Sequence, residues 1–290
     1  MQQTSTHGFT SPALLCSGSG NLQLLVLDVD GTIAGVSNQI HPLVQQAIQA
    51  AQARGVQVAI ATGRMYRSAL RFHQAIGSRL PLIAYQGALI RDPATEQTHC
   101  HQTISRQTAL QLLDYFEQVE YQQELSVHVY INDQLYVRAL SAETQTYIER
   151  VAIDAIPVGD LRQVLTEEPT KVLALSHTST HIDNLLSDLR KRYSPAELYL
   201  TKSVATFFEA THPLVNKGAA VRYLAEELLG LQAANVMTIG DNLNDLEMIE
   251  YAAVGVAMGN APESVKAVAD WVAPDVELQG AAAAIEQFLL

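Results

Sequence analysis

Short apolar runs alternate with amphipathic segments through the first third of the chain. Residues 22–27 are almost all apolar, which is typical of a strand buried on both faces of a parallel sheet. The next segment has apolar residues at helical spacing between His41-Pro42 and Gly55, which favour the start and the end of a helix. A strand at 56–61, a helix at 65–76 and a strand at 82–85 continue the alternation. This order predicts right-handed βαβ crossovers.

The middle of the chain has a different pattern. Residues 127–131 and 134–140 flank Asn132-Asp133, as the two strands of an antiparallel hairpin would. Further patterns of this α+β region indicate helices at 142–151 and 182–192 and strands at 171–175, 198–201 and 206–209. Strands and helices then alternate again, at 217–229, 236–239, 245–253, 254–257 and from 262 onward.

The fold class that this order predicts is α/β, with a doubly wound, Rossmann-like parallel-sheet core and an inserted α+β cap domain. We expect the core to comprise residues 21–88 and 206–290, and the cap residues 89–205. Residues 1–20 are polar, rich in Gly, Ser and Thr, and without an apolar period. They predict a disordered leader.

Composition narrows the class of protein. The 290 residues include 18 Lys and Arg against 30 Asp and Glu, a net charge of −12, and no basic run. This argues against a nucleic-acid-binding surface or a polybasic membrane patch. No apolar stretch approaches the roughly 20 residues of a membrane span. Two cysteines, Cys16 and Cys100, cannot form a disulfide framework, so we expect a cytoplasmic protein, and no protein partner is implied.

Polar residues gather where four predicted strands end. Ligands of open α/β sheets bind outside the carboxyl ends of the strands, so these residues predict a shared site. Two aspartates one residue apart, with a third from another strand, offer hard oxygen ligands suited to Mg²⁺. The four segments are Asp28-Val29-Asp30-Gly31-Thr32, Thr62-Gly63-Arg64, Tyr85-Gln86-Gly87 and Gly240-Asp241-Asn242-Leu243-Asn244-Asp245.

The first, second and fourth of these segments, together with Asn216-Lys217-Gly218, resemble in order the four motifs of the haloacid dehalogenase-like phosphohydrolases. The long insertion after the third strand resembles that of the Cof-type subfamily, which has a large α+β cap. The resemblance covers about residues 22–290. It implies a Mg²⁺-dependent phosphatase that hydrolyses a small phosphorylated metabolite, such as a sugar phosphate or a phosphorylated cofactor, through an aspartyl-phosphate.

The resemblance also implies a role for each matching residue. Asp28 would be the nucleophile, and Asp30 would protonate the leaving alcohol and then activate water. Asp28, the backbone carbonyl of Asp30, and Asp241 would hold Mg²⁺. Lys217 would supply fixed positive charge, since a lysine at a helix N-terminus needs compensation by carboxylates or phosphate.

The phosphoryl group would be bound by Thr62 and the Gly63 amide, helped by the N-terminus of the helix that begins there. Two residues of the fourth motif leave alternatives open. Asn244 either contacts the phosphate or caps the next helix. Asp245 either reaches the metal through water or orients Lys217.

One position departs from the family pattern, which usually has Asn-Gly-Ala where this chain has Gln86-Gly87-Ala88. Gln keeps the amide but lengthens the side chain, so a contact to the leaving group does not carry over. Other polar residues are at least as consistent with packing or solvation, and no site role is assigned to them: Arg64, Arg91, His128, Tyr130 and Arg138.

Two other functions fit the same motifs. A phosphomutase or other phosphotransferase would pass the phosphoryl group to a sugar hydroxyl in place of water. A catalytically silent metabolite-binding module would keep the fold alone, but the intact Asp28, Asp30 and Lys217 argue against it. For the phosphatase, we expect the core to carry the phosphate chemistry and the insertion to select the substrate.

Overall fold

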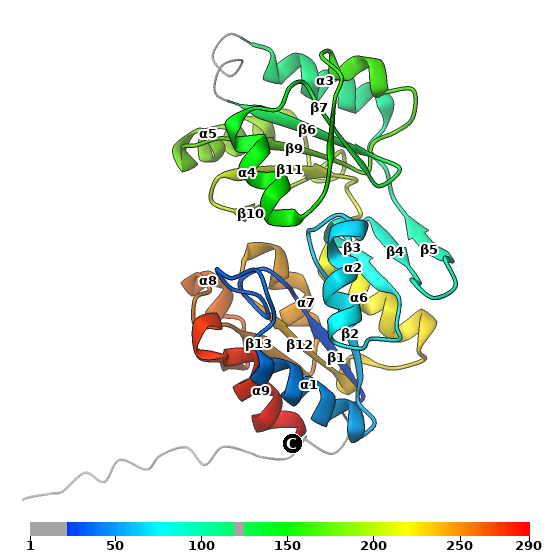
Figure 1. Ribbon diagram of the computed structural model, residues 1–290, viewed down its shortest axis with the longest axis vertical. Helices are drawn as coiled ribbons and strands as arrows, with labels where there is room; N and C mark the ends of the chain where they lie inside the picture. Colours follow the sequence, from blue (N-terminus) through cyan, green and yellow to red (C-terminus); the bar gives the residue numbers. More distant parts are fainter. Residues whose placement is uncertain (1–21, 119–124) are drawn as a thin grey trace, which may run out of the picture.

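A five-stranded, all-parallel sheet forms the centre of one half of the molecule (Figure 1). The computed structural model describes residues 22–118 and 125–290, and the predicted leader lies outside them. Across the sheet, the strands run in the order β14 (Trp271–Val272), β13 (Val254–Ala257), β12 (Val236–Gly240), β1 (Leu24–Leu27) and β2 (Gln57–Ile60).

Helices cover both faces of this sheet because alternate residues of its strands point to opposite sides. Leu25 and Leu27 belong to the apolar cluster that includes α1 (Pro42–Ala53), α2 (Tyr66–Ala75) and α9 (Gly280–Leu289). Leu24 and Val26 belong to a second cluster, with α6 (Lys217–Tyr223) and α7 (Leu246–Tyr251). This arrangement confirms the predicted doubly wound core.

The predicted start and end of α1 are confirmed. His41 is the N-cap and its ring accepts a hydrogen bond from the Leu43 amide, while Pro42 is the first helical residue. Gly55 follows the helix with a φ of +90°, which favours glycine.

A six-stranded sheet forms the other half of the molecule (Figure 1). The hairpin of β6 and β7 is confirmed, with Asn132 and Asp133 both at positive φ in its turn. All neighbouring pairs are antiparallel except β7 with β8. The strands lie in the order β10 (Tyr199–Val204), β11 (Phe207–Thr211), β9 (Lys171–Leu175), β6 (Ser126–Ile131), β7 (Gln134–Val137) and β8 (Ala155–Pro157).

Helices α3 (Arg106–Phe116) and α5 (Ser179–Arg192) pack together on one face of the six-stranded sheet. The helix α4 (Ala142–Val151) packs on the opposite face, through Tyr147 and Val151. The face that carries α4 is turned toward the parallel sheet (Figure 1).

A three-stranded sheet lies beside the edge of the core sheet (Figure 1). It consists of β3 (Leu82–Ala84), β4 (Leu89–Arg91) and β5 (Thr98–His101), all antiparallel. A parallel bridge between Ala61 and Ile83 connects β3 to the edge of the core sheet beyond β2.

The predicted domain boundaries stay a prediction, but the strand pairing favours a later return to the core. The predicted core segment from 206 onward includes β11, whereas β11 pairs with β9 and β10 in the six-stranded sheet. The chain therefore leaves that sheet only after Thr211.

Among the residues described, none of the helices combines the length and the hydrophobicity that a membrane span requires.

The remaining elements are short. The predicted helix 217–229 consists of α6 followed by a π-helical segment. The short helices are Tyr85–Gly87, Leu161–Val164, Leu224–Leu228, Ala233–Asn235, Leu243–Asp245, α8 (Glu263–Lys266) and Val276–Leu278.

Candidate active site

Three carboxylates lie together at the carboxyl ends of the central strands. Asp28 follows β1 and Asp241 follows β12, and each of these, with Asp245, offers an oxygen within 4.8 Å of the others. Gly31 allows the loop after β1 to approach this acidic cluster: it has a φ of +80°, and a Cβ there would lie 2.2 Å from Asp241 Oδ2. A larger residue at position 31 would therefore displace Asp241.

Lys217 is fully buried beside the acidic cluster. Its Nζ donates hydrogen bonds of 2.6 Å to Asp28 Oδ1 and of 2.6 Å to Asp245 Oδ1. Burial would lower the pKa of Lys217, but the charges of Asp245 and Asp28 raise it above its usual value. Asp245 thus contacts Lys217, as one of its two predicted alternatives requires, and it also belongs to the acidic cluster.

A single lysine does not balance the charge of three carboxylates. Burial raises the pKa of Asp28 to about 7, although Lys217 opposes the shift. Burial, together with repulsion by Asp28 and Asp245, raises the pKa of Asp241 to about 9. Uncompensated negative charge among oxygen ligands suits a divalent cation, so the residues present fit such an ion.

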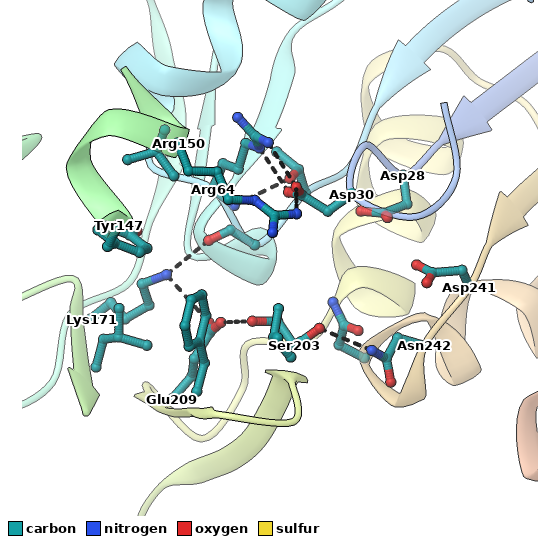
Figure 2. A pocket seen from close by; sticks show the side chains of 17 residues that line it. Asp28, Asp30, Arg64, Tyr147, Arg150, Lys171, Ser203, Glu209, Asp241 and Asn242 are labelled. Atoms are coloured by element: carbon teal, nitrogen blue, oxygen red, sulfur yellow. Dashed lines mark hydrogen bonds and ion pairs between the residues drawn. The ribbon is translucent and has the colours of Figure 1, made fainter. Parts of the chain in front are cut away.

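The Asp30 carboxylate lies apart from the acidic cluster and is held by two arginines (Figure 2). Arg64 Nε and Nη2 donate to its two oxygens at 2.7 Å each, and Arg150 Nη2 lies 3.3 Å from Oδ1. Burial would raise the pKa of Asp30, but the two guanidinium groups lower it below its usual value. The Asp30 carboxyl group thus does not belong to the acidic cluster, and its expected role in proton transfer requires a carboxyl group that does not bind the metal.

A cavity of about 50 Å³ lies between the parallel sheet and the six-stranded sheet (Figure 2). The core residues along it include six that the sequence singled out: Asp28, Asp30, Thr62, Gly63, Asp241 and Asn244. Lys217 and Asp245 lie behind them, bonded to each other. The structure thus brings all the predicted site residues together.

The helix-capping alternative for Asn244 is not what the structure shows. Asn242, not Asn244, accepts the Leu243 amide at the start of that turn. Asn244 Nδ2 instead donates to Gln86 Oε1 at 3.0 Å. Asn244 therefore lies at the cavity, tied to the residue that departs from the family pattern.

Four residues beside the cavity had no role in the sequence-based prediction. Lys171 of β9 and Glu209 of β11 reach the cavity from the six-stranded sheet, and Arg150 reaches it from α4. Gln86 lies behind Gly63, where a Cβ would be 2.4 Å from Gln86 Nε2. The sequence signal for Lys171 and Glu209 is a charged residue beside apolar neighbours in a short strand.

Four of the polar residues to which no role was assigned have structural partners. Arg91 is ion-paired with Glu96, and Arg138 with Glu117. His128 Nε2 lies 2.9 Å from Thr144 Oγ1, and Tyr130 donates to the Tyr147 hydroxyl at 2.7 Å. The fifth residue, Arg64, lines the cavity.

A family model described as haloacid dehalogenase-like hydrolase matches residues 25–285, so the chain belongs to this family of hydrolases. Its members generally use a divalent metal, and the acidic cluster offers ligands for one. The resemblance, the enzyme class and the fold class expected from the sequence are confirmed.

Individual relatives span nearly the whole chain. YxeH of Bacillus subtilis (strain 168) is 30% identical over 276 residues, covering 92% of this chain and 98% of YxeH. The 5-amino-6-(5-phospho-D-ribitylamino)uracil phosphatase YitU of the same organism is 28% identical over 276 residues, covering 91% and 97%. The crystal structure of TM0651 from Thermotoga maritima superposes with a TM-score of 0.76 at 29% identity, covering 92% and 97%.

Proposed function

We propose that this protein is a Mg²⁺-dependent phosphatase that hydrolyses a small phosphorylated metabolite through an aspartyl-phosphate on Asp28. The observation that carries the proposal is the contact of Asp28 with Lys217 beside the cavity. Asp28 lines this cavity together with Asp30, Thr62 and Asn244. A carboxylate can act as a nucleophile toward phosphorus where fixed positive charge offsets the repulsion between two anions.

The reaction has two displacements at phosphorus. In the first, an Asp28 oxygen bonds to phosphorus, the bond to the ester oxygen breaks, and Asp30 gives its proton to the leaving alcohol. In the second, Asp30 takes a proton from water, whose oxygen displaces Asp28 and releases inorganic phosphate. Because Asp30 is ion-paired with Arg64 and Arg150, it must loosen these contacts to carry a proton.

The chain's other residues hold the phosphoryl group and the ion. The Thr62 hydroxyl, the Gly63 amide and Asn244, which all line the cavity, bind the phosphoryl oxygens in this proposal. Mg²⁺ would be held by Asp28, Asp241 and the Asp30 backbone carbonyl. When bound, it supplies positive charge that offsets the negative charge of the phosphoryl oxygens.

The leaving group would meet residues of the six-stranded sheet and of α4, which packs on it. Tyr147, Arg150 and Phe207 line the cavity on that side, with both aromatic and charged groups. YitU, which is 28% identical to this chain over 276 residues, is named for a phosphorylated ribitylamino uracil. We therefore propose a small phosphorylated metabolite as substrate, chosen by the insertion, in place of a nucleic acid or a membrane lipid.

A screen of phosphorylated metabolites tests this function. Wild-type protein should release inorganic phosphate in the presence of Mg²⁺ with water as the acceptor, and Asp28→Asn should release none. Transfer of the phosphoryl group to an added sugar, with no free phosphate, would instead support the phosphotransferase alternative.

A further inference from the structure

Lys171 of β9 and Glu209 of β11 form a buried ion pair that the proposed chemistry does not use. Each residue is 2% exposed, and Lys171 Nζ lies 3.3 Å from Glu209 Oε2. A buried ion pair has a large desolvation cost unless further hydrogen bonds satisfy both charges. Figure 2 shows the pair and the contact of Glu209 with Ser203 of β10. The other hydrogen-bond partners of the pair, Gly63 and Gln86, lie outside the six-stranded sheet.

One chain of hydrogen bonds runs from Lys171 to the predicted phosphate-binding hydroxyl. Lys171 Nζ donates to the Gly63 carbonyl at 2.9 Å. The N–H of the same peptide unit, which belongs to Arg64, donates to Thr62 Oγ1 at 3.2 Å. A cationic donor on a carbonyl polarises its peptide, so the N–H and then the hydroxyl become stronger donors. Thr62 Oγ1 accepts this bond and keeps its own proton for another acceptor.

A second chain of hydrogen bonds runs from Glu209 to Asn244, another predicted phosphate-binding residue. Glu209 Oε2 accepts from Gln86 Nε2 at 3.3 Å, and Gln86 Oε1 accepts from Asn244 Nδ2 at 3.0 Å. Gln86 is fully buried with a φ of 62°, a conformation that costs energy in a residue other than glycine. The arrangement holds Gln86 where its longer side chain contacts both Glu209 and Asn244.

We propose that Lys171 and Glu209 are positioning residues that make the six-stranded sheet, docked on the core, part of the phosphate-binding site. Through the Gly63–Arg64 peptide and through Gln86, the pair orients Thr62 and Asn244 together. By linkage, bound phosphate in turn stabilises the docked position of the six-stranded sheet. This inference rests on the proposed function, because it concerns the same phosphate-binding residues.

The test is the affinity for inorganic phosphate in the presence of Mg²⁺, measured by isothermal titration calorimetry on the full chain. The double variant Lys171→Met/Glu209→Gln removes both charges together, so that neither is left buried and unpaired. It should bind phosphate roughly tenfold more weakly, the loss expected for a charge-assisted hydrogen bond. Lys191→Met, which breaks an exposed pair with Asp188, is the control and should bind phosphate as the wild type does.

A double-mutant cycle separates positioning from general structural support. If Lys171 acts through the Thr62 hydroxyl, Lys171→Met should weaken phosphate binding much less in a Thr62→Val background than in the wild type. Additive losses would mean that Lys171 only supports the fold, and this would overturn the first chain.

Gln86→Met tests the second chain independently and leaves the ion pair intact. The Gln86→Met variant should also weaken phosphate binding several-fold. If the thermal unfolding curve shows that the double variant does not fold, Gln86→Met takes its place in the test. Unchanged phosphate affinity in the folded variants would overturn the proposal. Failure of the proposed function has a different signature, namely phosphate release that persists in Asp28→Asn.

Discussion

Lys217 Nζ lies 2.6 Å from Asp28 Oδ1, and the two residues are 189 positions apart in the chain. Lys217 is fully buried, and its other carboxylate partner, Asp245, is fully buried as well. In such a site a lysine can hold a carboxylate in one orientation and offset its charge when a phosphate dianion approaches. The contact thus joins the first and third sequence motifs in one unit.

Replacing this lysine should harm both turnover and folding. Lys217→Met leaves Asp28 and Asp245 buried without their cation, so the free energy of unfolding should fall by about 3 to 5 kcal/mol. The value of kcat should fall by about 10²-fold or more, since fixed positive charge is lost from the phosphoryl site. Urea unfolding and phosphate release measure the two effects. Lys266→Met, which loses only an exposed pair with Glu263, should change neither.

Asp30 should be needed for proton transfer but not for binding. Asp30→Asn keeps the shape of the side chain but cannot exchange a proton, so kcat should fall on the order of 10²-fold or more. The affinity for inorganic phosphate should stay near the wild-type value. Asp114→Asn, at an exposed ion pair with Arg162, is the matched control. Full turnover by Asp30→Asn would show that another group carries the proton.

Activity should require Mg²⁺ and depend on Asp241. Excess chelator should abolish phosphate release, and Asp241→Ala should raise the Mg²⁺ concentration needed for half-maximal activity about tenfold or more. Ca²⁺ should bind yet inhibit, because its larger and more flexible coordination relaxes the geometry of in-line displacement. Asp92→Ala, at a turn outside the cavity, should leave the Mg²⁺ requirement unchanged. Undiminished activity in chelator would contradict the metal assignment.

The acidic cluster should make the metal-free protein less stable as the pH rises. The folded-state pKa values of Asp28 and Asp241 are raised from 3.8 to about 7 and about 9. For a raised carboxyl pKa, the stability contribution is complete below the unfolded-state pKa and is lost as the pH rises through the folded-state pKa.

The melting temperature in chelator should accordingly fall as the pH rises from about 4, near the unfolded-state pKa, to about 9, the folded-state pKa of Asp241. Asp241→Asn should remove the upper part of this fall, because the amide does not ionise. Mg²⁺ should raise the melting temperature more at the higher pH, where it no longer competes with protons. A melting temperature in chelator that is independent of pH would show that the cluster carries no uncompensated charge.

Local sequence patterns predicted the core and the site residues, because buried strands and the polar residues that follow them can be recognised within a few neighbouring residues. The apolar run before Asp28 predicts a strand, and parallel strands bring their carboxyl ends to one edge, so Asp28 and Asp241 could be placed together. The hairpin of β4 and β5 was missed because its strands are only three and four residues long, and β5 has no buried residue to give an alternating pattern.

The contacts between the insertion and the core were also beyond the reach of the sequence. Lys171 and Gly63 are 108 positions apart, and Arg150 and Asp30 are 120 positions apart. No spacing rule connects such residues, because the packing of two sheets brings them together. Arg64 could be named as a candidate, but its bidentate contact with Asp30 depends on the fold of two separate loops.

The central claim is that Asp28 becomes covalently phosphorylated during turnover. The most direct measurement is an acid quench of the wild-type protein during hydrolysis, followed by peptide mass spectrometry to locate a phosphoryl group. We predict a single phosphorylated position, Asp28, and the phosphoryl group should form there only in the presence of Mg²⁺. It should be absent in Asp28→Asn. It should accumulate in Asp30→Asn if the attack of water becomes the slow step. A phosphoryl group on any other residue would contradict the account, as would turnover by Asp28→Asn.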